Sequence, residues 1–151
     1  MSFLLGSATS ADAPAIVALL AQAGLPTADL TPAALAGFVV ARADGALVGA
    51  VTVERHGDAG LLRSLVVAPG QRGRGLGRAL VDAVERGARA QGLLSLALLT
   101  QSAGEFFAAR GYRVAPRSAV AEALRASSQF ASVCPASATC MAKPLVSFPD
   151  P

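Results

Sequence analysis

The chain has 151 residues, which is long enough for one domain with a hydrophobic core and too short for two ordinary domains. Hydrophobic residues make up 53% of it and charged residues 15%, so the composition excludes an intrinsically disordered protein. The formal net charge is +3, and only Arg72, Arg74 and Arg78 are truly clustered among the thirteen basic residues. This distribution lacks the long basic stripe of a duplex-binding protein and suits a small anionic ligand better than nucleic acid.

The sequence predicts neither a membrane span nor a disulfide framework. Its longest strongly apolar stretch, 93–99, is far shorter than the roughly 20 residues that a membrane helix needs. No basic segment precedes the short apolar run at the start, so we expect no secretory signal. Cys134 and Cys140 are spaced unlike a disulfide framework or a C-x-x-C metal site. We therefore expect a cytoplasmic protein without a structural metal ion.

Helical and strand patterns alternate through the first half of the chain. A capping box at Thr9–Asp12 is followed by apolar residues at helical spacing until Gly24, which predicts a first helix. Asp44-Gly45 between two apolar runs predicts a hairpin, because both central residues of a type I′ turn need a positive φ. The predicted elements are a helix over 9–23, a short helix over 31–36, and strands over 38–43, 46–55 and 61–67.

The same alternation continues through the second half. Four apolar residues at helical spacing predict a helix over 76–91. The further predicted segments are a strand over 93–100, a short helix over 102–109, a short strand over 112–114, a helix over 118–126, an irregular stretch over 127–136, a strand over 138–143 and a flexible tail over 144–151. This order predicts a single α/β (α+β) domain over 1–143, with a mixed central sheet of about six to seven strands flanked by helices.

Glycine alternates with arginine in the segment that joins the strand at 61–67 to the long helix. Glycines allow the backbone to approach a ligand, and a helix start offers unpaired N–H groups and the positive end of its dipole. A pyrophosphate fits such a loop. A P-loop would need a lysine, which the chain lacks before Lys143, and a dinucleotide fingerprint would need a different glycine spacing. The loop residues expected to bind a coenzyme are Arg72, Gly73, Arg74, Gly75, Leu76, Gly77 and Arg78.

The residues of this loop also give the chain a family resemblance. Arg72-x-x-Gly75-x-Gly77, with the strand Leu65–Ala68 before it, resembles the coenzyme motif of the GNAT acetyltransferases. The resemblance covers about residues 7–143 and implies a GNAT-like fold with acetyl-CoA as co-substrate. It also implies that main-chain amides of the loop bind the coenzyme pyrophosphate.

The strand before the loop has an implied role of its own. In the family this strand splays from its neighbour, and its main-chain groups contact the pantetheine and the acetyl carbonyl. Leu65, Val66 and Val67 would make these contacts here. A main-chain amide near Leu65 would stabilise the oxyanion that forms during acetyl transfer.

A second segment, 100–112, is similar to the later family motif N-x-x-A-x-x-[LF]-Y-x-x-x-G-F, with two departures. Thr100 replaces the usual Asn, and Phe107 stands where a Tyr often protonates the leaving CoA thiolate. The resemblance places both residues at the coenzyme. Phe107 can pack there but cannot be an acid, so water or another group has to protonate the thiolate.

The acceptor side has fewer signals in the sequence. An acceptor amine has to lose a proton, and Glu54 is the best-placed base because it ends the strand expected to pair with that of Arg63 and Ser64. A solvated rim carboxylate is an equally good interpretation of Glu54, and a surface residue is the more common one for His56. Arg63 lies in an apolar strand, where it needs either a partner acid or a substrate anion.

Three further segments, at 24–30, 61–65 and 130–138, resemble the arsenic-resistance-associated branch of the GNAT enzymes. Cys134 lies in the last of them, and its thiolate could bind trivalent arsenic in the acceptor pocket, because both are soft. A small buried hydrophobic residue is the more common role of such a cysteine.

The resulting hypothesis is direct transfer of acetyl from acetyl-CoA to the amine of a small anionic acceptor, such as an organoarsenical amino acid. Glu54, Arg63, Ser64 and Cys134 would face this acceptor. Two alternatives stay open: a non-catalytic CoA-binding or metalloid-binding module, and an acetyltransferase for protein N-termini or lysines. The oligomeric state also stays open, although a homodimer is common in the family.

Overall fold

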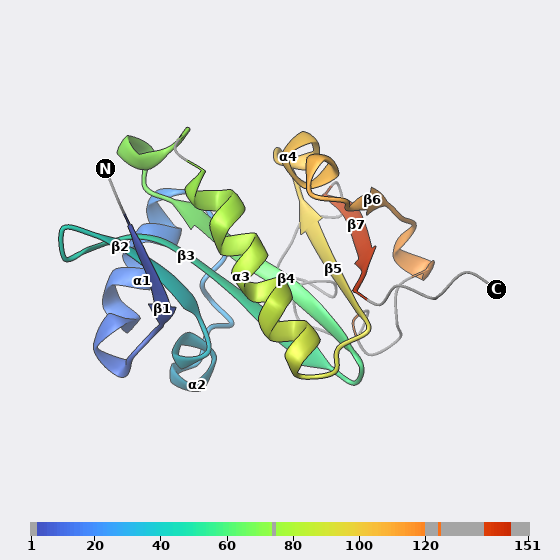
Figure 1. Ribbon diagram of the computed structural model, residues 1–151, viewed down its shortest axis with the longest axis horizontal. Coiled ribbons are helices and arrows are strands. Elements are labelled where there is room, and N and C mark those ends of the chain that lie inside the picture. Colours follow the sequence, from blue (N-terminus) through green and yellow to red (C-terminus); the bar gives the residue numbers. More distant parts are fainter. Residues whose placement is uncertain (1–2, 74, 120–123, 125–137, 146–151) are drawn as a thin grey trace. The chain divides into compact units, whose positions relative to one another are not determined.

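The computed structural model describes residues 3–73, 75–119, 124 and 138–145 (Figure 1). Within these residues seven strands form one mixed sheet in the order β1-β2-β3-β4-β5-β7-β6. The strands are β1 Leu4–Ser7, β2 Val39–Ala43, β3 Ala46–His56, β4 Ala59–Val67, β5 Ser95–Thr100, β6 Arg113–Val114 and β7 Thr139–Pro144. The helices are α1 Ala13–Gln22, α2 Pro32–Ala36, α3 Leu76–Ala90 and α4 Gly104–Ala109, with 3₁₀ turns at Ser10–Asp12, Pro69–Gln71 and Arg117–Ala119.

The chain forms two compact units, the first from residues 1–53 and 63–84 and the second from 54–62 and 85–151. In the first unit, β1, β2 and β3 pair antiparallel. In the second unit, β4 pairs parallel with β5, whereas β7 pairs antiparallel with β5 and with β6. The sheet is therefore mixed, as the sequence predicts.

The core of the first unit lies between α1, α2 and the sheet. Its buried residues are Ile16, Leu20, Leu35, Phe38, Val40, Ala50 and Val66. Val40 and Ala50 are partners in the β2–β3 register, so their side chains share the face that meets the two helices. Apolar residues four positions apart on α1 meet this face because they lie on one side of a helix.

Helix α3 begins against the opposite face of β3. A Cβ atom on Gly49 would lie 3.0 Å from the Leu80 side chain and 3.3 Å from that of Leu76. Both leucines are buried. A side chain at residue 49 would thus push against the first turns of α3, so this glycine sets how closely the start of the helix approaches the strand.

The second unit is held together by a buried polar group as well as by apolar packing. The Tyr112 hydroxyl donates to Glu85 Oε2 at 2.9 Å, and Lys143 Nζ donates to Glu85 Oε1 at 2.9 Å and to the Arg110 carbonyl at 2.8 Å. These bonds tie the end of α3 to β7 and to the residues that follow α4. The apolar core beside them contains Ala59, Leu61, Ala97, Leu124 and Cys140.

The structure confirms most of the predicted elements and corrects some boundaries. Asp44 and Gly45 have φ angles of 52° and 80°, as the predicted hairpin turn requires. β4 begins at Ala59 rather than 61, and β5 begins at Ser95 rather than 93. β7 extends to Pro144, and Leu145 is buried, so the domain boundary predicted at 143 falls within the sheet. Most of the predicted helix over 118–126, the irregular stretch over 127–136 and most of the tail lie outside the described residues.

The sequence did not predict β1. Three of its four residues are exposed, so the strand lacks the alternation of apolar and polar residues that marks a half-buried strand. β1 and β6 form the two edges of the sheet and are only four and two residues long, which limits pairing with other chains.

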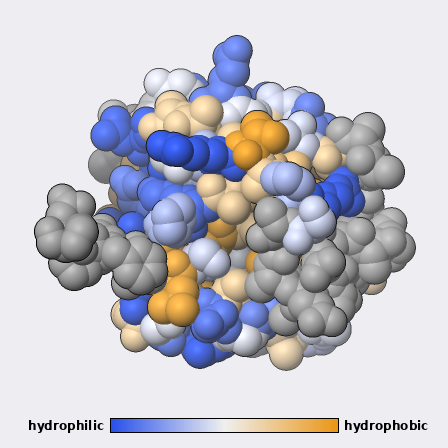
Figure 2. Space-filling model, turned by 90° about the vertical axis from the view of Figure 1, so that its right-hand side faces the viewer, coloured by the Kyte–Doolittle hydropathy of each residue, from blue (hydrophilic) through white to orange (hydrophobic). Residues whose placement is uncertain are grey.

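The helices, the possible metal ligands and the surface of the described residues bear on the predictions about membranes, metals and partners. No helix among the described residues is long and apolar enough to cross a bilayer. In the same part of the chain, His, Cys, Asp and Glu side chains form no group of three or more that could hold a metal ion. On the face drawn in Figure 2, apolar residues form small separate areas among hydrophilic ones. The homodimer stays a prediction.

Candidate coenzyme and acceptor site

The connection from β4 to α3 has the backbone that the sequence predicts for an anion-binding loop. Gly73 and Gly75 have φ angles of 81° and 78°, in the left-handed region that favours glycine. No described heavy atom lies within 4 Å of a Cβ built on either glycine, so the space beside them is open to a ligand. Arg74 lies outside the described residues.

The start of α3 supplies amide groups at this loop. The first bond of the helix joins the Ala79 amide to the Gly75 carbonyl at 3.0 Å, so the amides before residue 79 lack partners within the helix. Arg72 and Arg78 are both exposed. The amides at a helix start, the positive end of a fifteen-residue helix and two arginines together favour a phosphate or pyrophosphate.

A small pocket lies beside the loop in the first unit. Its lining residues are Leu19, Gln22, Ala23, Val66, Val67, Pro69 and Arg72. Val66, Val67 and Arg72 were predicted as coenzyme contacts, and the structure brings them to the same pocket. The three residues at the end of α1 were missed, because their helical spacing shows that they share a face but not what that face meets.

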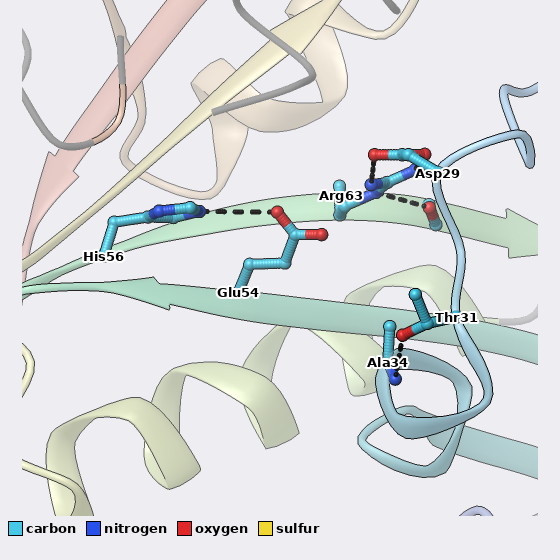
Figure 3. Close-up of polar contacts among 7 residues, drawn as sticks. Asp29, Thr31, Ala34, Glu54, His56 and Arg63 are labelled. Carbon is cyan, nitrogen blue, oxygen red and sulfur yellow. Dashed lines mark hydrogen bonds and ion pairs between the residues drawn. The ribbon is translucent and has the colours of Figure 1, made fainter. Parts of the chain in front are cut away.

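Arg63 on β4 has the partner acid that one of its two interpretations required. Its Nη1 donates to Asp29 Oδ2 at 2.5 Å and its Nη2 to Asp29 Oδ1 at 2.9 Å (Figure 3). Its Nε donates to Ser64 Oγ at 3.1 Å. The Arg63 side chain is 2% exposed and that of Asp29 15%. The Asp29 carboxylate therefore balances the charge of the Arg63 guanidinium and accepts two hydrogen bonds from it.

Ser64 adopts an unusual backbone conformation in the middle of β4. Its φ angle is 61°, and Asp44 in the hairpin turn is the other non-glycine residue with a positive φ in the described part of the chain. Such a conformation is rare inside a strand and is often found at functional sites. It directly precedes the stretch Leu65–Val67.

Glu54, the predicted general base, lies near the end of β3 and next to a histidine. Its Oε1 lies 3.4 Å from His56 Nε2, and both side chains are 25% exposed (Figure 3). Residues two positions apart in a strand share a face, which explains the pairing. Sequence reasoning had set His56 aside as a surface residue, although this spacing was visible.

Comparison with known proteins decides the family. A profile described as "Acetyltransferase (GNAT) domain" matches residues 34–114, which is more than half of the chain. The chain belongs to the GNAT acetyltransferase family. The matched residues include β4, the glycine–arginine loop, α3 and the segment around Phe107. A search among curated proteins found no match.

Several solved structures share the fold. N-acetylglutamate synthase from Neisseria gonorrhoeae, solved with coenzyme A and N-acetyl-glutamate, superposes with a TM-score of 0.84 at 23% identity. The match covers 97% of this chain but only 36% of that enzyme. Rv2747 from Mycobacterium tuberculosis, solved with CoA, superposes with a TM-score of 0.80 at 24% identity, and the match covers 95% of this chain and 99% of the other. An alanine N-acetyltransferase for a ribosomal protein, from Escherichia coli, superposes with a TM-score of 0.69 at 17% identity. That match covers 99% of this chain and 97% of the other.

In this GNAT domain, the two departures from the later family motif have clear local roles. The Thr100 hydroxyl accepts a bond from the Ala103 amide at 3.0 Å and so caps the turn before α4. Phe107 is buried, with edge-to-face contacts to Phe106 and Tyr112 at centroid distances of 5.1 and 5.5 Å. Their contacts with a coenzyme stay predictions.

Tyr112 is the single tyrosine of the chain and the obvious substitute for a tyrosine acid at 107. It is 2% exposed, and its hydroxyl already donates to Glu85. Burial first, and then the Glu85 charge, raise the pKa of the Tyr112 hydroxyl well above its ordinary value of about 10. A group this deeply buried and this weakly acidic is a structural residue rather than the acid for a CoA thiolate.

One of the two cysteines, Cys140, lies in the part of the chain that the structure describes. Cys140 is buried in the core of the second unit, and burial raises the pKa of its thiol. It therefore has little thiolate character and little reactivity. Cys134, the predicted metalloid ligand, lies outside the described residues.

Proposed function

We propose that this GNAT acetyltransferase transfers the acetyl group of acetyl-CoA directly to the amine of a small acceptor. The observation that carries the proposal is the β4–α3 loop. Its left-handed glycines leave open space, the amides of α3 begin there, and Val66, Val67 and Arg72 line the adjoining pocket. An acyl-CoA thioester has a pyrophosphate and an extended pantetheine, and these features match a loop at a helix start that is preceded by a strand.

The loop, the end of β4 and the predicted base each have a part in this proposed reaction. Main-chain amides at 73–78 and the side chains of Arg72 and Arg78 hold the pyrophosphate. Main-chain groups of Leu65–Val67 hold the pantetheine and acetyl carbonyl, and an amide near Leu65 stabilises the oxyanion. Glu54 accepts the proton that the acceptor ammonium releases, directly or through water, and His56 hydrogen-bonds its carboxylate.

Atoms and charges balance as follows in a direct transfer. The neutral amine attacks the thioester carbonyl carbon, a C–N bond forms, and the C–S bond breaks to release the CoA thiolate. After the attack the nitrogen carries a positive charge, and it gives its extra proton to water. Water in turn protonates the thiolate, because Phe107 has no proton to give and the Tyr112 hydroxyl is engaged with Glu85. The products are an N-acetyl amine and free CoA.

We propose a small amino acid-like anion as the acceptor. The net charge of +3 favours an anion, and N-acetylglutamate synthase, which shares the fold, was solved with N-acetyl-glutamate. An organoarsenical amino acid falls in the same chemical class, and its support is the resemblance of 24–30, 61–65 and 130–138 to the arsenic-resistance branch. The rival acceptor is a protein N-terminus, and its support is a structure of similar fold that is an N-acetyltransferase for an alanine of a ribosomal protein.

A free-thiol release assay tests the proposal. The purified protein is incubated with acetyl-CoA and, in turn, with free amino acids, organoarsenical amino acids and peptides that begin with alanine. Release that depends on a free amino acid supports the proposal, and preference for peptides assigns a protein acceptor. Binding of acetyl-CoA without amine-dependent release across all three panels would instead assign a coenzyme-binding module.

A further inference from the structure

The segment between α1 and α2, residues 23–31, lies close to β4 at both of its ends. Ala23 lines the pocket together with Val66 and Val67. At the other end, Asp29 forms the bidentate pair with Arg63, which lies 34 positions later in the chain. This segment therefore runs alongside the part of β4 from residue 63 to residue 67, all within the first unit.

Arg63 also bonds to the residue with the unusual backbone. Its Nε–H donates to Ser64 Oγ, so one guanidinium joins Asp29 to the residue at which β4 leaves ordinary strand geometry. The next residues, Leu65–Val67, are those that would hold the acetyl group. A positive φ at a serine persists only where surrounding contacts enforce it, and the Arg63 bonds are such contacts.

We propose that Arg63 and Asp29 are a positioning pair: they fix segment 23–31 beside the acetyl-binding stretch of β4 and thereby set how the acceptor amine approaches the thioester. This inference rests on the proposed acetyl transfer. Neither residue touches the acceptor or the coenzyme; both act through the segment and through Ser64.

A buried ion pair contributes little to stability by itself, because proteins in which apolar side chains of similar size replace such a pair are often as stable or more stable. A planar guanidinium and a carboxylate, in contrast, fix direction as well as distance through two parallel bonds. The Arg63–Asp29 geometry is of this kind. Lysine would keep the charge of Arg63 but lose the fork, and asparagine would keep the shape of Asp29 but lose its charge.

The test compares Arg63→Lys, Asp29→Asn and the apolar double variant Arg63→Met/Asp29→Leu, which removes the charges together and so leaves neither unpaired. Arg42→Lys is the control, because Arg42 pairs with Asp12 at 2.6 Å in the same unit and neither residue lies in segment 23–31 or on β4. Three quantities are measured: the acceptor KM and kcat, the Kd for acetyl-CoA, and hydrogen exchange of the amides of Leu25 and Leu30, which bond to the Leu20 and Thr27 carbonyls.

The expected result is a rise of tenfold or more in acceptor KM for all three variants, with the acetyl-CoA Kd changed less than twofold. Exchange at Leu25 and Leu30 rises at least tenfold in these variants and stays unchanged in Arg42→Lys. A folded variant with unchanged KM and unchanged exchange overturns the proposal. So does a KM effect that vanishes when the acceptor carboxylate is replaced by an amide, because Arg63 would then bind the acceptor itself.

Failure of the proposed function has a different signature. Wild-type protein that releases no thiol with any amine refutes the transfer reaction. The exchange measurement still judges the pair in that case, because faster exchange confined to segment 23–31 is required by the positioning role and needs no turnover.

Discussion

Replacing Gly75 by valine tests the coenzyme loop most directly. At a φ of 78° a β-branched residue is strained by about 1–2 kcal/mol, so the variant either loses stability or moves its backbone out of the left-handed region. Moving the backbone there turns two amides at the start of α3 away from the pyrophosphate. Hydrogen bonds to a charged group contribute about 1.5–3 kcal/mol each, so two lost bonds amount to about 3–6 kcal/mol. Affinity for acetyl-CoA should fall by a factor of about 10² to 10⁴.

Gly45→Val is the matched control for this prediction. Gly45 has a φ of 80° and, like Gly75, open space around its built Cβ, but it lies in the hairpin turn between β2 and β3. Both variants should lose about 1–2 kcal/mol of stability, which lowers Tm by roughly 2–8 °C. Calorimetric titration with acetyl-CoA then separates the two effects. If Gly75→Val binds acetyl-CoA as tightly as Gly45→Val does, the loop does not hold the coenzyme.

Three further predictions concern the base, the buried tyrosine and the start of α3. Glu54→Gln should lower kcat about 10²-fold near neutral pH with unchanged Tm, and initial rates measured against pH should show the deficit shrinking as the amine loses its proton unaided. Tyr112→Phe should leave kcat within twofold but cost about 1.5–3 kcal/mol in denaturant unfolding, because the bond to charged Glu85 is lost. The wild-type protein should lose stability above about pH 10, because the unfolded chain then releases the Tyr112 phenol proton that the folded state keeps. The stability of Tyr112→Phe should not fall with pH for this reason. Gly49→Val should cost about 1–3 kcal/mol and weaken acetyl-CoA binding in titration, because the new side chain meets Leu80 and displaces α3; unchanged binding would refute that coupling.

Features that depend on neighbours in the sequence could be predicted. The Asp44-Gly45 turn follows from the φ angles that a type I′ turn demands, and Thr31 caps α2 through its bond from the Ala34 amide. The backbone at Gly73 and Gly75 belongs to the same group, because glycines between a strand and a helix permit the left-handed conformation seen there. The coenzyme-binding role of this loop stays a prediction. These are short-range rules, and the structure confirms the elements that they predict.

Features that depend on distant residues could not be predicted. Nothing near Arg63 shows that its partner is Asp29 rather than a substrate anion, because the two lie 34 positions apart and only the fold joins them. Glu85 gives no sign in its helix that it will accept bonds from Tyr112 and Lys143. The pocket face of α1 was missed for the same reason: helical spacing defines a face but not its neighbour.

Because residue 107 is a phenylalanine, the proposed transfer should depend more on the base than on an acid. A thiolate with an ordinary pKa near 8.5 leaves readily at neutral pH, so protonation by water is a small disadvantage. The α-amine at the N-terminus of a peptide has a pKa near 8 and a lysine amine has one near 10.4, so at neutral pH a lysine acceptor depends far more on a base. Loss of the Glu54 carboxylate should accordingly slow a lysine acceptor much more than an α-amino acceptor. Equal losses for both, measured with a peptide that begins with alanine and with a lysine whose α-amine is blocked, would show that Glu54 does not remove the acceptor proton.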